Sequence, residues 1–154
     1  MEADEMFGLP VVRWDDVTVR FPPERSKMLV AHGYSQMNRD RAEKSSLALA
    51  AGYKLANYIH SRANVSSTAV IGDNCIIMDN VTVEPFVEIG DNVCLNSKVI
   101  VAHHSKIHEN CWITPGTVIA GTCTIGGNCF LAVNSTLAHN ITIRRGEFHR
   151  GPVP

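Results

Sequence analysis

The sequence predicts a mainly β protein, a parallel β-helix preceded by an incomplete α/β segment. Three observations carry this prediction. An aliphatic residue recurs at every sixth position over most of the chain, small side chains recur four residues after each of them, and asparagine recurs at a spacing of eighteen. A repeat with a fixed period indicates a solenoid, in which each unit packs only on its neighbours.

The six-residue period runs without an insertion. If Ile, Leu and Val filled roughly a quarter of positions by chance, the whole run would have odds of order one in a billion. Its positions are Ile59, Val65, Ile71, Ile77, Val83, Ile89, Leu95, Val101, Ile107, Ile113, Ile119, Ile125, Leu131, Leu137 and Ile143. The period therefore sets the fold class, and these side chains are the predicted core.

A second set of mostly small or slim residues follows four positions later. Its members are Ala63, Ala69, Cys75, Val81, Val87, Val93, Val99, Ser105, Cys111, Thr117, Cys123, Cys129, Ser135 and Ile141. Four of the five cysteines lie in this set, which favours compact buried side chains over metal ligands. The remaining one, Cys94, has no chelating neighbour. An odd number of cysteines without a CxxC pair indicates reduced thiols.

The eighteen-residue period groups the hexads into coils. The segments 71–76, 89–94, 107–112 and 125–130 begin alike, and each places an asparagine in the same register. Asparagine tolerates the left-handed backbone of a tight turn, so a repeated asparagine predicts a repeated corner. Three hexads then make one triangular coil, and residues 59–148 make 90/18 = 5 coils stacked at the strand spacing of ~4.8 Å.

The residues before the repeat follow another pattern. Residues 8–24, GLPVVRWDDVTVRFPPE, predict a strand, a short acidic turn and a proline-bearing loop. Residues 27–31 predict a short strand, and residues 40–51 predict a helix that ends at Gly52. Residues 53–59 return to an extended run. A strand, a helix and a strand suggest half of an α/β unit.

These boundaries divide the chain into a partial α/β segment over residues 1–58, a β-helix over 59–148 and a tail over 149–154. A chain of 154 residues can bury one core and is too short for two independent ones. The net charge of −1 indicates neither a nucleic-acid nor a membrane-surface partner. Because no signal peptide or long apolar run is found, we expect a cytoplasmic protein without membrane insertion.

Two stretches resemble a known family. GYKLANYIHSRANV (residues 52–65) and HHSKIHENCWITPGTVIAG (residues 103–121) are similar to sugar O- or N-acyltransferases of the sialic-acid O-acetyltransferase and UDP-amino-sugar N-acetyltransferase type. The resemblance covers nearly the whole chain and implies a left-handed β-helix behind a Rossmann-like nucleotide-sugar-binding part. The family's opening strand and glycine-rich loop, and its further coils after the repeat, have no counterpart in this sequence.

The histidine cluster at residues 103–108 is the candidate site. A spacing of eighteen stacks His103 above Pro85 and below Gly121, with His139 two coils away. Because Gly121 has no side chain, a pocket about one coil tall could open beside the imidazole of His103. Such a pocket would suit an incoming thioester.

The resemblance implies a reaction and a role for each part of this cluster. An acyl group, typically acetyl, would pass from acyl-CoA to an amino or hydroxyl group of a sugar or nucleotide-sugar, in surface glycan biosynthesis. His103 would be the general base, since imidazole accepts a proton near neutral pH. The backbone N–H of Gly121 would stabilise the oxyanion. No metal is expected, and the family resemblance implies a homotrimer with acyl-CoA between neighbouring subunits.

The group that orients the base is left open. Members of the family often carry an acidic residue directly after the base, and here His104 stands in that position. His104 could orient His103 or could itself be the base. Glu84 and Glu109 are candidate replacement carboxylates whose position the sequence does not reveal.

Other residues of the cluster have two interpretations each. His108 replaces a glycine of the sister segments and could be an exposed corner residue. The spacing of eighteen stacks Trp112 on Cys94 and Phe130, with Phe148 beyond. Trp112 could form a wall of the acyl-CoA pocket or belong to an outward aromatic stripe buried against another subunit. Ala120, beside Gly121, is a further candidate contact for acyl-CoA, and Asn134 fits either such a contact or a turn.

Two other functions remain as alternatives. A γ-class carbonic anhydrase shares the β-helix and binds zinc through three histidines, and His103 and His108 have the HxxxxH spacing found there. A third histidine is missing one coil upstream, and a catalytic zinc needs three protein ligands. The other alternative is a non-catalytic β-helix that binds a nucleotide-sugar or serves as a structural spacer.

Overall fold

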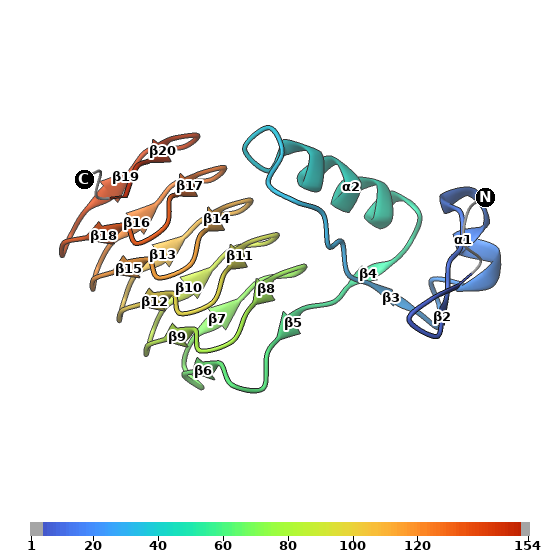
Figure 1. The fold of residues 1–154 in the computed structure, drawn as a ribbon, viewed down its shortest axis with the longest axis horizontal. Helices are drawn as coiled ribbons and strands as arrows, with labels where there is room; N and C mark the ends of the chain where they lie inside the picture. Colours follow the sequence, from blue (N-terminus) through green and yellow to red (C-terminus); the bar gives the residue numbers. More distant parts are fainter. Residues whose placement is uncertain (1–4, 152–154) are drawn as a thin grey trace.

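The computed structural model describes residues 5–151 and contains a parallel β-solenoid with an N-terminal part beside it (Figure 1). The short strands of the solenoid form three parallel sheets. Each sheet is named after one of the consecutive strands β12, β13 and β14, which belong to different sheets. The β12 sheet contains β6 (Asn64–Val65), β9 (Thr82–Val83), β12 (Ile100–Val101), β15 (Val118–Ile119) and β18 (Thr136–Leu137). The β13 sheet contains β7 (Val70–Ile71), β10 (Glu88–Ile89), β13 (Lys106–Ile107), β16 (Thr124–Ile125) and β19 (Thr142–Ile143). The β14 sheet contains β5 (Tyr58–Ile59), β8 (Ile76–Ile77), β11 (Cys94–Leu95), β14 (Trp112–Ile113), β17 (Phe130–Leu131) and β20 (Phe148–His149).

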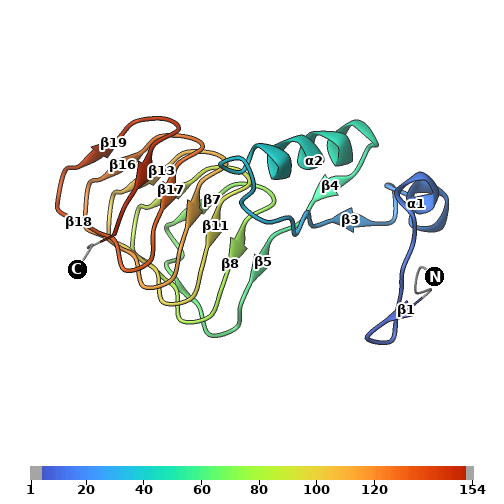
Figure 2. The same cartoon turned by 45° about the horizontal axis from the view of Figure 1, so that its top comes forward.

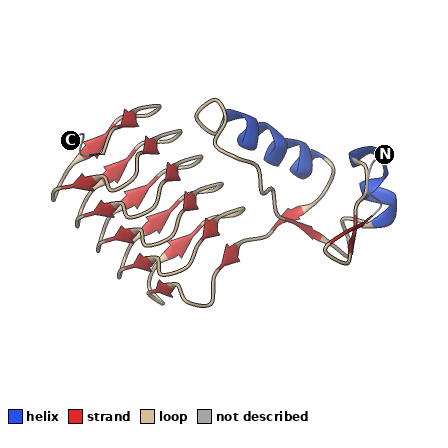
Figure 3. Cartoon of the chain, in the orientation of Figure 1, coloured by secondary structure: helices blue, strands red, loops and turns tan. Residues whose placement is uncertain are grey.

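The register of these sheets confirms the eighteen-residue coil. In the β13 sheet Ile89 pairs with Ile71 on one side and with Ile107 on the other. The same offset holds through all three sheets, so each coil contributes one strand to each face. The prediction of a mainly β protein with a parallel solenoid of about five turns is confirmed (Figure 3).

The interior of the solenoid is formed largely by the two predicted sets of side chains, although Ile141 of the second set is 38% exposed. The aliphatic positions from Ile77 to Ile143 are buried, whereas Ile59, at the first coil, is 46% exposed. All five cysteines are buried and free. Burial raises the pKa of Cys75 to about 11 and that of Cys94 to about 12, so both remain thiols and serve as small core residues.

From residue 74 to residue 146 each hexad turns a corner through one residue with a positive φ. The asparagines of the eighteen-residue pattern hold this position, with φ of 55° at Asn74, 62° at Asn92, 59° at Asn110 and 58° at Asn128. Left-handed backbone costs least for Gly and Asn. The prediction that these asparagines mark a corner is confirmed.

The N-terminal part contains β1 (Glu5–Met6), β2 (Leu9–Pro10), α1 (Trp14–Arg20), β3 (Lys27–Met28), α2 (Arg39–Ala50) and β4 (Lys54–Leu55). The expected acidic turn is wrong, because its residues form α1. Asp15 and Asp16 in the first turn and Arg20 in the last complement the helix dipole and favour the helix.

The strand, helix and strand predicted over residues 27–59 are present. β3 and β4 pair in parallel, with α2 as the connection, and Gly52 ends the helix with a φ of 91°. Two short strands and one helix form only a fragment of an α/β layer, so the Rossmann-like character of this segment is not confirmed. The domain boundaries drawn from the sequence remain a prediction.

α2 lies beside the solenoid (Figure 2), and a buried arginine of the helix bonds to two of its coils. Arg41 is fully buried and donates hydrogen bonds to the carbonyl oxygens of Val30, Asn74 and Asn92 at 3.1, 2.6 and 2.6 Å. Burial lowers the pKa of its guanidinium, which remains charged because arginine starts so high. The carbonyls therefore solvate a cation that joins the N-terminal part to the coils.

Across residues 5–151, neither helix has the length and apolar character required to cross a membrane.

Candidate active site

The three edges of the prism are called corners here, and the candidate site lies on one of them. The His103 corner joins the β12 and β13 sheets and contains residues 84–87, 102–105, 120–123 and 138–141. The asparagine corner joins the β13 and β14 sheets and contains residues 72–75, 90–93, 108–111, 126–129 and 144–147. The third corner contains residues 78–81, 96–99, 114–117 and 132–135.

The imidazole of His103 rests directly on Gly121. A Cβ atom built on Gly121 would lie 2.7 Å from Cε1 and 2.9 Å from Nε2 of His103. These distances are too short for a real Cβ atom, so any other residue at this position would displace the ring. The sequence identified Gly121 as the residue that leaves space here. The structure shows that the ring of His103 occupies part of this space, so Gly121 is required for the position of the ring.

His104 supplies the hydrogen-bonding partner of the His103 ring. The two Nδ1 atoms lie 3.1 Å apart, so one of them carries the proton and the other accepts it. Among residues 5–151 the Nε2 atom of His103 has no hydrogen-bond partner. Both rings are exposed at the corner. If Nδ1 of His103 is protonated, its Nε2 atom is a free acceptor directed away from the pair.

The backbone around Gly121 has a free donor. Its carbonyl oxygen accepts hydrogen bonds from the backbone N–H of Asn140 and the hydroxyl of Thr122, and Nδ1 of His139 lies 3.3 Å away. Its N–H has no acceptor within the described part of the chain. An unpaired N–H beside an imidazole is the arrangement that can stabilise an oxyanion.

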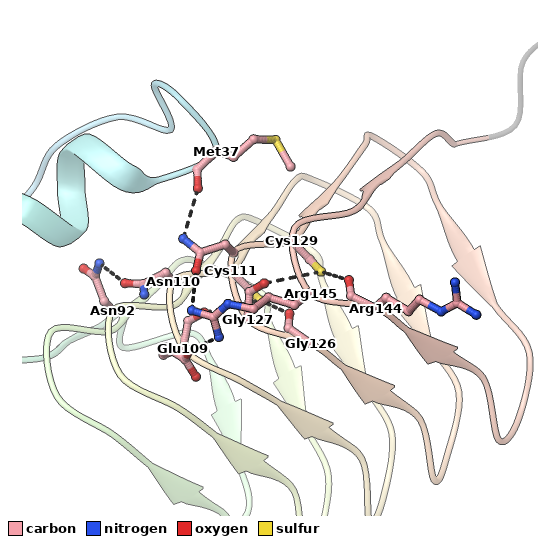
Figure 4. A network of polar contacts seen from close by, with 11 residues as sticks. Met37, Asn92, Glu109, Asn110, Cys111, Gly126, Gly127, Cys129, Arg144 and Arg145 are labelled. Carbon is pink, nitrogen blue, oxygen red and sulfur yellow. Dashed lines mark hydrogen bonds and ion pairs between the residues drawn. The ribbon is translucent and has the colours of Figure 1, made fainter.

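Only one of the two candidate carboxylates lies at this corner. Glu84 accepts a hydrogen bond from the backbone N–H of His103 at 2.9 Å, so it holds the backbone, and the imidazole is held by His104. Glu109 lies on the asparagine corner, where it pairs with Arg145 (Figure 4). The hydrogen bond from Arg145 lowers the pKa of Glu109. Glu109 is therefore part of a structural ion pair.

The remaining candidates lie at different places on the prism. Ala120 is on the His103 corner, and its carbonyl accepts a hydrogen bond from Ser105 Oγ at 3.0 Å. Asn134 is on the third corner with a φ of 57°, so it forms a turn there. His108 is an exposed residue of the asparagine corner. Within residues 5–151 of one chain, the candidates Glu109, His108 and Asn134 lie on other corners than His103.

Trp112 lies on the β14 sheet, which is the face opposite the His103 corner. It pairs in register with Cys94 and Phe130, as the spacing of eighteen predicted. The ring of Tyr34 covers both aromatic residues, with centroids 5.5 Å from Trp112 and 5.2 Å from Phe130. This chain's own N-terminal part therefore packs on Trp112 and Phe130, whereas Phe148, stacked on Phe130, is 53% exposed. The roles of Trp112 and Asn134 in acyl-CoA binding remain predictions.

Sequence reasoning missed Phe86. Its ring centroid lies 5.0 Å from that of His104, and its own φ is 62°. One signal could have found it: position 86 belongs to the series of left-handed corner positions, and phenylalanine is an unfavourable residue there.

Within residues 5–151, no cluster of three or more His, Cys, Asp or Glu side chains could hold a metal ion.

Comparisons with known proteins agree with this architecture. The family described as the GMPPB C-terminal domain matches residues 55–148. A search of curated proteins finds no match. The acetyltransferase domain of PglB from Neisseria gonorrhoeae FA1090, in complex with acetyl coenzyme A, is 26% identical with a TM-score of 0.88, over 98% of this chain and 72% of that one.

Two further solved structures are similar. PerB from Caulobacter crescentus, in complex with CoA and GDP-perosamine, is 26% identical with a TM-score of 0.87, over 96% of this chain and 70% of that one. WeeI from Acinetobacter baumannii AYE is 16% identical with a TM-score of 0.67, over 94% of this chain and 76% of that one, and shows a shared fold only.

Proposed function

The chain belongs to the family of the GMPPB C-terminal domain, and we propose that it is an acyltransferase that moves an acetyl group from acetyl-CoA to the amino group of a nucleotide-linked sugar. Two similar solved structures support the substrates, since one binds acetyl coenzyme A and the other binds CoA and GDP-perosamine. A third structure is a histidine-to-alanine variant of a GDP-perosamine N-acetyl transferase, which supports a histidine at the centre of the reaction.

One observation in this chain carries the proposal. The free Nε2 atom of His103 and the free N–H of Gly121 lie on the same corner, with the imidazole in contact with the glycine. A base and an oxyanion donor that flank one position are what acyl transfer from a thioester requires. This arrangement needs no metal ion for proton transfer.

The proton follows a simple route. The sugar nitrogen attacks the thioester carbon, and Nε2 of His103 takes the proton that the nitrogen gives up. The N–H of Gly121 donates to the oxyanion. The intermediate then collapses: the C–S bond breaks while the new C–N bond is kept. The thiolate of CoA takes up the proton held by His103, so that an amide and free CoA are formed.

His104 takes the place of the orienting acid. As a neutral imidazole it can accept the Nδ1 proton of His103 across the 3.1 Å contact, which leaves Nε2 of His103 unprotonated and directed to the substrate. Glu84 supports the same geometry through the backbone of His103. In this arrangement His103 is the base and His104 orients it.

The active assembly is proposed to be a homotrimer in the cytoplasm, with acyl-CoA held between neighbouring chains. The distribution of candidates over separate corners supports this proposal, since Asn134 could reach a His103 corner only from another chain. Sedimentation should give three times the mass of one chain, and an active monomer would contradict the assembly.

The experiment that tests the function is a measurement of thiol release. Acetyl-CoA is mixed with the protein and with GDP-perosamine or another nucleotide-linked amino sugar, and free CoA is followed. We expect His103→Ala to reduce kcat by about 10² to 10⁴, the range for loss of a general base, with an unchanged melting temperature. His108→Ala is the matched control, because His108 is an exposed corner histidine outside the site.

Two results would overturn the proposal. Retained turnover in His103→Ala would remove His103 from its role as base. Absence of CoA release with every amino-sugar nucleotide, although the protein binds acetyl-CoA, would favour a binding protein without this activity.

A further inference from the structure

The left-handed corner positions form a series in which most residues follow one rule. From position 74 to position 146 every sixth residue has a positive φ. Asparagine and glycine fill most of these positions: Asn74, Asn80, Asn92, Asn110, Gly116, Asn128, Asn134, Asn140 and Gly146. The exceptions are Phe86, Lys98, His104 and Thr122. A residue other than Gly or Asn is strained at such an angle, and a bulky one is an outlier.

Three of the four exceptions lie together, and Lys98, on the third corner, is the fourth. Phe86, His104 and Thr122 stack on one another at the His103 corner, one in each of three successive coils. The asparagine corner has Asn or Gly at every one of its left-handed positions. Strained residues persist where their side chains are needed, so the His103 corner retains these three for what their side chains contact.

Burial does not explain Phe86. Its side chain is 57% exposed, so the core gains little from it. Its backbone N–H is held by Thr68 Oγ1 at 3.1 Å, a bond that any residue at this position could make. The specific contact of the ring is with His104, at a centroid distance of 5.0 Å and an interplanar angle of 36°.

We propose that Phe86 is a positioning residue that holds the ring of His104 so that Nδ1 of His104 faces Nδ1 of His103. The proposal rests on the function proposed above and adds a residue to its machinery. The ring of His104 contacts two other rings, that of Phe86 at a centroid distance of 5.0 Å and that of His103 at 5.3 Å. A phenyl ring is neutral, so it restrains His104 without competing for its proton.

The titratable neighbours make other contacts, so the contact between the two Nδ1 atoms involves only the two histidines. Glu84 is engaged by the backbone N–H of His103, and the Nδ1 atom of His139 lies beside the carbonyl oxygen of Gly121. Without Phe86, the exposed ring of His104 could rotate about its χ angles, and the Nδ1 to Nδ1 contact would be lost for part of the time. His103 would then spend less time with a free Nε2 atom.

The decisive variant is Phe86→Asn, because stability and activity should change in opposite directions. Asn relieves the left-handed strain, so the melting temperature should rise by about 2 to 4 °C. The loss of the ring should lower kcat by about tenfold, since small displacements of a catalytic group have effects of this size. Phe86→Tyr keeps the ring and should retain most of kcat.

Lys98→Asn is the matched control. Lys98 has the same left-handed geometry, with a φ of 63°, but it lies on the third corner. This variant should raise the melting temperature by a similar amount and leave kcat unchanged. A double variant of Phe86→Asn with His104→Ala should be no slower than His104→Ala alone, because Phe86 acts through His104.

One measurement does not depend on turnover. Nitrogen NMR shifts of the His103 imidazole report which nitrogen carries the proton, and Phe86→Asn should reduce the fraction protonated at Nδ1. If the wild type transfers no acyl group, the proposed function fails while this measurement still tests Phe86. A destabilised Phe86→Asn protein whose His103 tautomer is unchanged would show that Phe86 is structural and would overturn the proposal.

Discussion

The asparagine corner and the His103 corner have the same backbone and different side chains. Both turn through one left-handed residue per coil. The His103 corner precedes each strand of the β13 sheet, and the asparagine corner follows it. The asparagine corner repeats its side chains, and Asn74, Asn92 and Asn110 form a ladder of amide hydrogen bonds at 2.8 and 2.6 Å. At the His103 corner the left-handed positions carry four different residues: Phe86, His104, Thr122 and Asn140.

The difference follows from what each corner contacts. The asparagine corner is covered by α2 and the loop before it, through hydrogen bonds that involve Arg41, Ser45 and Asn38. The His103 corner is exposed, and its histidines contact each other. A regular column of side chains suits a docking edge within the chain, whereas the irregular column concentrates the groups that can act on a substrate.

The largest effect is expected from Arg41→Met at the asparagine corner. Three buried carbonyl oxygens would lose their donor, and each unsatisfied buried group costs roughly 1 to 3 kcal/mol. We expect a loss of at least about 3 kcal/mol in the free energy that holds α2 on the solenoid. Hydrogen exchange should show α2 losing protection while the strands keep theirs.

Arg39→Met is the matched control for this comparison. Arg39 lies at the start of the same helix with its side chain exposed, so its replacement should leave the exchange of α2 unchanged. If Arg41→Met also left α2 protected, the buried guanidinium would not be what joins the two parts of the molecule.

At the His103 corner the corresponding change is Gly121→Ala. The new Cβ would lie 2.7 Å from Cε1 of His103, so the imidazole has to move. We expect kcat/KM in the thiol-release measurement to fall about 10²-fold, the loss that follows when a catalytic group is displaced by about 1 Å. Gly33→Ala is the control, since no atom lies within 4 Å of a Cβ at that glycine. Full activity of Gly121→Ala would mean that the close contact is not required.

The coils could be predicted from the sequence because their rule is local and repeated. A period of six places each side chain inside or outside the prism without reference to the rest of the chain, and a period of eighteen gives its vertical neighbours. These two rules correctly placed His103 against Gly121 and Trp112 against Phe130.

The docking of the N-terminal part could not be predicted in the same way. Arginine in a helix normally faces solvent, and only the carbonyls of a distant corner make the burial of Arg41 favourable. α1 was missed because Val17, Thr18 and Val19 suggest a strand or a turn, while the acidic residues before them suit the start of a helix. Phe86 was overlooked, although the break in the corner series was visible in the sequence.

A smaller effect is expected for Asn92→Ala in the amide ladder. Alanine at a φ of 62° is strained, and the hydrogen bonds from Asn74 and to Asn110 would be lost. These losses should total about 2 kcal/mol in the free energy of unfolding, measured with denaturant. Asn80→Ala carries the same strain on the third corner outside the ladder, so the difference between the two variants measures the side-chain hydrogen bonds of Asn92, which include the bond from Ser45 Oγ at 3.3 Å as well as the ladder. Equal losses would show that the ladder contributes nothing.

The smallest effect is expected at Glu109, and it depends on pH. The hydrogen bond from Arg145 holds the pKa of this carboxyl below its usual range, so its contribution is present above the usual glutamate pKa and is lost as the pH falls through the lowered value. For a solvent-accessible pair the contribution should be about 0.5 kcal/mol. Glu109→Gln should therefore reduce the free energy of unfolding at neutral pH, and the difference from wild type should vanish in acid. Glu43→Gln, on the exposed side of α2, should match the wild type at both pH values. A difference at Glu109 that persisted unchanged in acid would assign its effect to packing at the asparagine corner instead of charge.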